Sequence, residues 1–195
     1  MFTHNLKRLA WRPLIAGILL AGMPFGAFAQ SAGDTKLGVG KPVTKAELGK
    51  YFAIPPDGRG LPAGSGTPNE GRVVYMQNCA ICHGDKLQGN PKPGFGGDRL
   101  IGGRGSLASN APLKTVESYW PYATTLFDYI KRAMPFNAPG SLTDDQVYAA
   151  AAFILAEGHI IKPDATMNAT TLPQVEMPNR NGFVPDPRPE LSLYH

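Results

Sequence analysis

Cysteine and histidine are scarce in this sequence, with two cysteines and four histidines among 195 residues. Two cysteines form at most one disulfide, which excludes the multi-disulfide framework of a small secreted scaffold. So few cysteines and histidines also leave too few ligands for a large metal cluster. Charged residues make up only 17% of the chain and hydrophobic residues 43%. A chain of this length and composition buries one domain core and is too short for two large ones.

A true excess of positive charge is also missing. The formal net charge is +4, but residues 1–29 hold three of the 19 basic side chains and no acidic one. The rest of the chain has 16 basic against 15 acidic residues and no run rich in Lys or Arg. Because nucleic-acid binding needs a basic patch, we exclude nucleic acid as a partner.

Residues 1–29 are organised like a secretory signal. Three basic residues precede an apolar run from Leu14 to Met23, and Ala27-Phe28-Ala29 has the small-x-small pattern that signal peptidase accepts. An uncleaved membrane anchor is the alternative, but the run is shorter than the roughly 20 residues that span a bilayer, and Pro24 interrupts it. We expect cleavage after Ala29 and a mature chain that does not span a membrane and is periplasmic in a bacterium.

Both ends of the mature chain lack regular hydrophobic periodicity. Glycine and proline, 23 and 19 residues, predict long irregular connections. Residues 30–66 are predicted to form an extended arm, interrupted by a helical turn that starts at a capping box in Thr44–Glu47 and ends near Phe52. Residues 161–195 are Pro-rich and are predicted to form a tail, which either wraps a partner as a loop or is disordered.

Residues 67–160 carry the helix signals of a single domain. Thr67-Pro68-Asn69-Glu70 has the capping-box pattern and predicts a helix from Pro68 into Cys79. A second helix is predicted at about residues 124–133, where Pro135 stops it, and a third from Thr143 to Gly158. Glycines and prolines predict a long loop over residues 84–105. No strand is as clearly marked, so the predicted fold class is mostly α.

Cys79-Ala80-Ile81-Cys82-His83 is the one strong chemical motif, because Cys-x-x-Cys-His is the attachment pattern of c-type haem. Cysteines three residues apart at a helix end lie on one side, nearly one turn apart, as the two vinyl groups of one porphyrin edge require. The histidine that follows is placed to ligate the iron. The motif therefore predicts one covalently bound haem c.

Three other interpretations of this motif stay open. A structural zinc site needs further Cys or His ligands, and the sequence has no second Cys-x-x-Cys pair. A thioredoxin-like redox pair follows a strand, whereas a capped helix precedes this one. A structural disulfide between Cys79 and Cys82 is compatible with export, but it leaves the adjacent His83 without a role.

Met134 is the candidate for the sixth iron ligand. It lies between the second and third predicted helices, in a segment able to cross the distal haem face. Met76 is tethered next to the motif, and two further methionines, Met167 and Met177, lie in the tail. A buried core methionine is the alternative role for Met134. His159 is the rival ligand, although a histidine after a helix-ending glycine often caps carbonyl groups.

Aromatic side chains on both sides of Met134 are candidates for the apolar wall of a haem site: Tyr119, Trp120, Tyr122, Phe127, Tyr129 and Phe136. By hypothesis the Trp120 indole or a tyrosine hydroxyl such as that of Tyr122 donates to a haem propionate, with an ordinary aromatic core as the alternative. Arg99 and Arg104 either pair with propionates or lie solvated at the surface. The proximal His83 is predicted to donate to a carbonyl near residues 91–93.

Seven stretches carry a family resemblance: residues 60–66, 102–107, 114–125, 127–130, 132–137, 141–145 and 177–183. The chain resembles class I c-type cytochromes. More narrowly, it is similar to the cytochrome subunit of the Sox sulfane dehydrogenase and to cytochromes paired with molybdenum sulfite dehydrogenases. The resemblance implies a class I cytochrome c-like fold with long irregular N- and C-terminal arms. It also implies that Met134, in the Ala-Met-Pro-Phe stretch, is the distal ligand.

Electron transfer is the leading functional prediction. An iron held by both histidine and methionine has no free position for a substrate, and methionine raises its reduction potential. The resemblance implies a molybdenum subunit as electron donor, a downstream cytochrome as acceptor, and arms that wrap the partner. It leaves sulfane, thiosulfate-linked and sulfite oxidation open, because some Sox cytochrome subunits have two haem domains and this chain has one motif. A haem enzyme or gas sensor with an open distal position, and a haem-free adhesion or scaffold module, are the alternatives.

Overall fold

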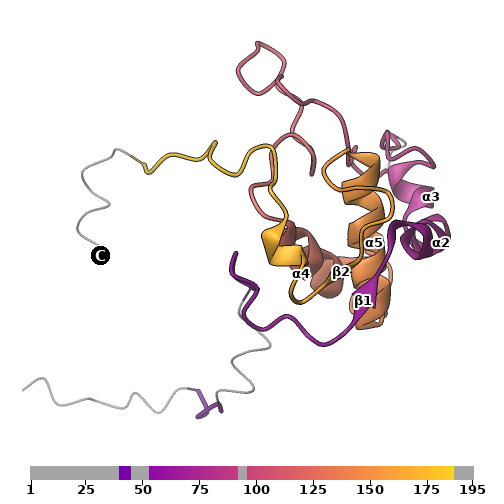
Figure 1. Cartoon of the computed structure of the whole chain (residues 1–195), viewed down its shortest axis with the longest axis vertical. Coiled ribbons are helices and arrows are strands. Elements are labelled where there is room, and N and C mark those ends of the chain that lie inside the picture. The colour runs from indigo at the N-terminus through magenta and orange to yellow at the C-terminus, as the bar shows by residue number, and fades with distance from the viewer. Residues whose placement is uncertain (1–39, 45–52, 92–95, 187–195) are drawn as a thin grey trace, which may run out of the picture. The chain divides into compact units, whose positions relative to one another are not determined.

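The computed structural model describes residues 40–44, 53–91 and 96–186 (Figure 1). By its internal contacts the chain divides into two units, Met1–Pro42 and Val43–His195. Every helix and strand named below belongs to the second unit. The export signal predicted at residues 1–29 and the helical turn predicted to end near Phe52 lie outside the described residues. Within the described ranges, no helix has the length and apolar character needed to cross a membrane.

Helix α2 (Pro68–Asn78) begins with the predicted capping box. The Thr67 Oγ1 atom accepts from the Glu70 N–H, and the Glu70 carboxylate accepts from the Thr67 N–H at 2.8 Å. Pro68 stands at the first helical position, where an N–H has no intrahelical partner anyway. Cys79 ends α2, and the short helix α3 (Ala80–His83) follows directly. The predicted helix and its end at the cysteine motif are therefore confirmed.

Helices α4 (Ala123–Ala133) and α5 (Asp144–Glu157) also lie where the sequence predicts them. In α5, Thr143 and Gln146 form a second capping box, with the Thr143 N–H donating to Gln146 Oε1 at 2.9 Å. The side chains from Val147 to Leu155 are all buried. Between His83 and Ala123 the described residues contain no helix or strand, in agreement with the predicted loop.

The core forms where α5 packs between α2 and α4 (Figure 1). The closest approach is at Gly71 of α2, where a Cβ atom would overlap the carbonyl group of Ala149. A glycine is needed here because the two helix backbones meet without space for a side chain. One turn further along, the rings of Tyr75 and Phe153 pack with centroids 5.1 Å apart. On the other side of α5, the ring of Phe127 from α4 packs against the ring of Tyr148, with centroids 4.4 Å apart.

A short antiparallel sheet joins the segment before α2 to the tail. Strand β1 (Ser65–Gly66) pairs with β2 (Met167–Asn168), with Ser65 opposite Asn168 and Gly66 opposite Met167. The sequence marks no strand as clearly as the helices, because two residues are too few to show the alternation by which strands are recognised.

The tail also contributes to the core. After β2 comes a single turn of 3-10 helix, η1 (Leu172–Gln174), and four tail side chains are buried in the core cluster: Met167, Leu172, Val175 and Met177. The tail is largely irregular, as predicted, but its part from Met167 to Met177 packs on the core. The division into an arm, a domain over residues 67–160 and a tail stays a prediction.

Candidate haem site

The two cysteines of the motif lie at the junction of α2 and α3. Cys79 caps α2, and the N–H groups of Cys82 and His83 both donate to its carbonyl oxygen, at 3.1 and 2.9 Å. Both cysteines are half-buried free thiols. Burial, with a smaller contribution from nearby Cys82, raises the pKa of Cys79 to about 11, so this group is neutral at physiological pH. Two free thiols one helical turn apart suit a pair of thioether bonds to one porphyrin edge.

The imidazole of His83 is fixed by a carbonyl group on the far side of the following loop. Its Nδ1 atom lies 2.6 Å from the carbonyl oxygen of Asp98. Because a carbonyl oxygen only accepts, Nδ1 carries the proton, and Nε2 keeps the lone pair that a metal ligand needs. The acceptor is therefore not near residues 91–93, and that prediction was wrong in position. The loop turns back at Gly97, whose N–H donates to Cys82 O at 2.9 Å, and so presents Asp98 to the ring.

Met134 stands where the chain leaves α4. It is the C-cap residue of that helix, its extended backbone turns the chain away from the helix axis, and its side chain is partly buried against the core. The rival His159 is exposed just beyond α5. Met167 and Met177 are buried in the core, and Met76 is half-exposed on α2. Met134 thus lies between α4 and α5, in the segment predicted to cross the distal haem face. Its role as an iron ligand stays a prediction.

The predicted aromatic wall divides into two groups. Trp120 and Tyr129 pack edge to face with ring centroids 5.6 Å apart, and both stay at least partly accessible. Tyr122 precedes the first residue of α4 and lies under the guanidinium group of Arg180 at 5.8 Å. The other residues are placed differently: Phe127 is fully buried between α4 and α5, Phe136 is 84% exposed, and Tyr119 packs against Phe183.

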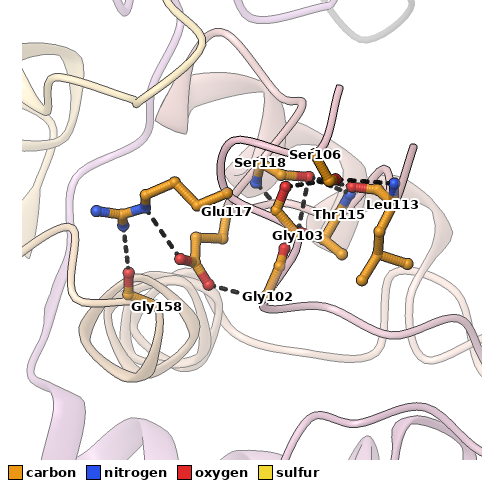
Figure 2. A network of polar contacts seen from close by, with 9 residues as sticks. Gly102, Gly103, Ser106, Leu113, Thr115, Glu117, Ser118 and Gly158 are labelled. Carbon is orange, nitrogen blue, oxygen red and sulfur yellow. Dashed lines mark hydrogen bonds and ion pairs between the residues drawn. The ribbon is translucent and has the colours of Figure 1, made fainter. Parts of the chain in front are cut away.

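The two candidate propionate-binding arginines both have partners within the protein. Arg104 donates from Nε to Glu117 at 3.0 Å and from Nη2 to the carbonyl oxygen of Gly158 at 2.7 Å (Figure 2). Arg99 donates from Nε to Gln88 O at 3.2 Å. Arg99 is thus held within the loop, whereas Arg104 connects the loop to the end of α5. The proposed pairing of Arg104 with a propionate stays a prediction.

Residues 66–154 match the family described as cytochrome C oxidase, cbb3-type, subunit III. The whole fold also resembles a chain in the crystal structure of the sulfane dehydrogenase SoxCD from Paracoccus pantotrophus, with a TM-score of 0.69. Sequence identity to that chain is 38%, and the alignment covers 82% of this chain and 78% of that one. This chain is a c-type cytochrome. The predicted mostly α, cytochrome c-like fold is therefore confirmed.

The cytochrome is also 27% identical over 118 residues to a thiosulfate dehydrogenase of Stutzerimonas stutzeri. That match covers 60% of the cytochrome but only 35% of the relative, so the chain spans about a third of that protein's length. The similarity to dehydrogenases of sulfur compounds thus comes from two separate proteins.

The site residues of the cytochrome fit the haem that its family binds. The motif offers two free thiols, the hydrogen bond from Nδ1 leaves Nε2 of His83 as a neutral nitrogen ligand, and Met134 offers a thioether. Nitrogen and thioether sulfur are the axial ligands of haem in electron-transfer cytochromes. Asp98 and Gly97 were not predicted from the sequence, because neither a backbone carbonyl nor a close approach of backbone to a ring leaves a local sequence pattern.

Proposed function

We propose that Cys79 and Cys82 form thioether bonds to a single haem c, with Nε2 of His83 and Sδ of Met134 as the axial ligands. The contact between His83 Nδ1 and Asp98 O carries this proposal, because it fixes both the tautomer and the orientation of the imidazole. Trp120, Tyr122 and Arg104 are the residues assigned to the propionate side. The bound haem supplies one-electron redox chemistry.

The protein surroundings then determine what the haem does. With both axial positions occupied, no position is left for a substrate, and thioether ligation favours the ferrous state. The hydrogen bond that His83 Nδ1–H donates to Asp98 O makes the imidazole a more electron-rich ligand. Such a site transfers single electrons and does not itself convert a sulfur compound.

The proposed electron donor is a molybdenum-containing dehydrogenase subunit that oxidises a sulfane or sulfite compound, and the acceptor is a downstream cytochrome. The 38% identity to a chain of SoxCD over most of both chains supports this partner class. In this proposal residues 1–29 direct export to the periplasm and are removed after Ala29. The segments 30–66 and 161–195, beyond the parts that pack on the core, wrap the partner.

Optical spectroscopy of the exported protein tests the ligand set. We expect a covalently attached haem on a denaturing gel and a methionine-to-iron charge-transfer band in the ferric state. The band should disappear in Met134→Ala and persist in the control Met76→Ala, which removes a half-exposed methionine next to the motif. Rapid binding of carbon monoxide to the untreated ferrous protein would instead indicate an open distal position, as in a haem enzyme or gas sensor.

Reduction by a purified partner tests the pathway. A molybdenum-containing sulfane or sulfite dehydrogenase subunit with its substrate should reduce the ferric cytochrome faster than the substrate alone does. A protein with the correct spectrum that accepts electrons from neither enzyme would contradict the partner while leaving the haem assignment intact.

A further inference from the structure

On the loop between the motif and α4, side chains hydrogen-bond both the N–H and the carbonyl group of one glycine, Gly102. The Gly102 N–H donates to Glu117 Oε2 at 2.6 Å, and its carbonyl oxygen accepts from Thr115 Oγ1 at 2.7 Å (Figure 2). We call the side chains of Thr115 and Glu117 the Gly102 clamp. A backbone unit held at both its N–H and its carbonyl by side chains is restrained in position as well as in rotation.

The clamp is itself anchored to the core. Glu117 is largely buried, with 13% of its side chain exposed, and its second oxygen accepts from Arg104, which also donates to Gly158 at the end of α5. A carboxylate that accepts a backbone N–H and a guanidinium N–H makes charge-assisted hydrogen bonds, which are stronger than neutral ones. Through Glu117 and Arg104, the position of Gly102 is therefore tied to the most buried helix of the fold.

The side chain of Thr115 is also held in place by hydrogen bonds. It is buried and exchanges hydrogen bonds with Ser118: each N–H donates to the other's hydroxyl oxygen at 3.0 Å, while Ser118 Oγ donates to Leu113 O at 2.6 Å. The Thr115 hydroxyl lies 2.7 Å from the Gly102 carbonyl oxygen and 3.2 Å from Ser118 Oγ, so its shorter contact is to the carbonyl. Removing the hydroxyl takes this donor away from the part-buried Gly102 carbonyl.

Gly102 follows closely after the residue that orients the proposed iron ligand. Asp98 O holds His83 Nδ1, and the chain then makes one backbone contact to the motif side, from Leu100 N–H to Leu87 O at 2.9 Å, before it reaches Gly102. The segment 98–102 is thus attached to the motif loop at one end and to the end of α5 at the other. Movement at Gly102 would be transmitted to the Asp98 carbonyl over four residues.

We propose that Thr115 and Glu117 are positioning residues for the proximal ligand: they hold the Asp98 carbonyl against His83 and so tune the reduction potential of the haem. This inference rests on the proposed function. A stronger hydrogen bond from Nδ1–H makes the imidazole a more basic ligand and stabilises the ferric state. Loosening the clamp weakens that bond, so the potential should rise.

The test uses the exported holoprotein, after mass spectrometry has established covalent haem. In Thr115→Val we expect the Nδ1–H proton of His83, followed by NMR in the ferrous state, to exchange with solvent about threefold to tenfold faster. The ratio of ferrous to ferric protein at a fixed potential should rise by a similar factor, where tenfold corresponds to about 59 mV for one electron. Thr115→Ser keeps the hydroxyl and should behave like wild type.

Two matched controls separate positioning from general perturbation. Thr171→Val removes another threonine hydroxyl that donates to a backbone carbonyl, that of Thr166 at 2.8 Å, in the tail rather than the loop. Glu157→Ala removes a negative charge near Glu117, since both side chains line the same 320 Å³ hollow with Gly102. Thr171→Val should change neither readout. Glu117→Ala should raise the potential more than Glu157→Ala and also speed the His83 exchange, which loss of charge alone does not explain.

The outcomes are distinguishable. If haem is attached and Thr115→Val is folded but keeps the wild-type exchange rate and potential, the clamp does not position the ligand. The same conclusion follows if Thr171→Val or Glu157→Ala gives an equal shift. If the exported protein carries no covalent haem, the proposed function itself is wrong, and this inference falls with it.

Discussion

Gly97 lies directly against the imidazole ring of His83. A Cβ atom on Gly97 would stand 2.8 Å from Nδ1 and 2.9 Å from Cε1 of that ring, closer than side-chain carbons approach in proteins. The Gly97 N–H also donates to Cys82 O at 2.9 Å, so the backbone cannot move away without losing a hydrogen bond. The missing side chain is therefore what allows the next residue, Asp98, to present its carbonyl to the ring.

Replacing this glycine should disturb the proximal side of the site. In Gly97→Ala we expect the ring to be displaced, the Nδ1 hydrogen bond to lengthen and the reduction potential to rise, with a loss of about 1–3 kcal/mol in the free energy of unfolding. Potentiometry and urea unfolding of the holoprotein measure both effects. The control is Gly105→Ala on the same loop, where a Cβ meets no atom within 4 Å. Gly105 has φ +79°, so its substitution costs backbone strain but should leave the potential unchanged.

At Gly71, helix propensity favours alanine, whereas the close packing of α2 on α5 requires glycine. Alanine is intrinsically better in a helix by about 1 kcal/mol, but here its Cβ would overlap the Ala149 carbonyl. We expect the overlap to dominate, so that Gly71→Ala destabilises the protein by about 1–2 kcal/mol net. Urea unfolding compares it with Arg72→Ala, which truncates the exposed neighbouring residue of the same helix. A Gly71→Ala protein as stable as wild type would show that the two helices separate readily.

The capping box of α2 predicts a pH dependence. Hydrogen bonds from the hydroxyl and the N–H of Thr67 hold the pKa of Glu70 below its ordinary value of 4.5. A carboxylate with a lowered folded pKa contributes stability above its unfolded pKa, and this contribution is lost as the pH falls through the folded value. Wild type should therefore lose stability below pH 4.5 in part through Glu70.

Glu70→Gln isolates this contribution. The Gln146 box of α5 shows that a glutamine side chain can also cap in this way. We expect the variant to keep its helix and to lose less stability than wild type on acidification, as measured by urea unfolding at a series of pH values. Parallel profiles for the two proteins would mean that the Glu70 carboxylate is not favoured by the fold.

The tail should matter for stability as much as a helix does. Leu172 is fully buried in η1, so Leu172→Ala should cost about 2–5 kcal/mol. Val184, further along the same tail, is 83% exposed, and Val184→Ala should change stability by less than about 0.5 kcal/mol. Equal and small effects of the two substitutions would place the tail outside the cooperative fold.

Features that depend on neighbours along the chain could be predicted from the amino-acid sequence. A capping box joins residues three apart, so Thr67 with Glu70 and Thr143 with Gln146 mark the starts of α2 and α5 directly. The spacing of Cys79, Cys82 and His83 is equally local, and it identifies the haem motif without knowledge of the fold.

Only the tertiary structure decided which distant groups meet. Folding brings the carbonyl group of Asp98, fifteen residues after His83, to the imidazole Nδ1 atom as its hydrogen-bond acceptor. It also pairs β1 with β2, about a hundred residues further along the chain. The fold also buries Phe127 in the core, whereas Trp120 and Tyr129 pack together at its partly accessible edge. Contacts of this kind involve backbone carbonyls, glycines and apolar side chains that many positions offer. Their identity is fixed only when helix packing and loop closure bring particular ones together.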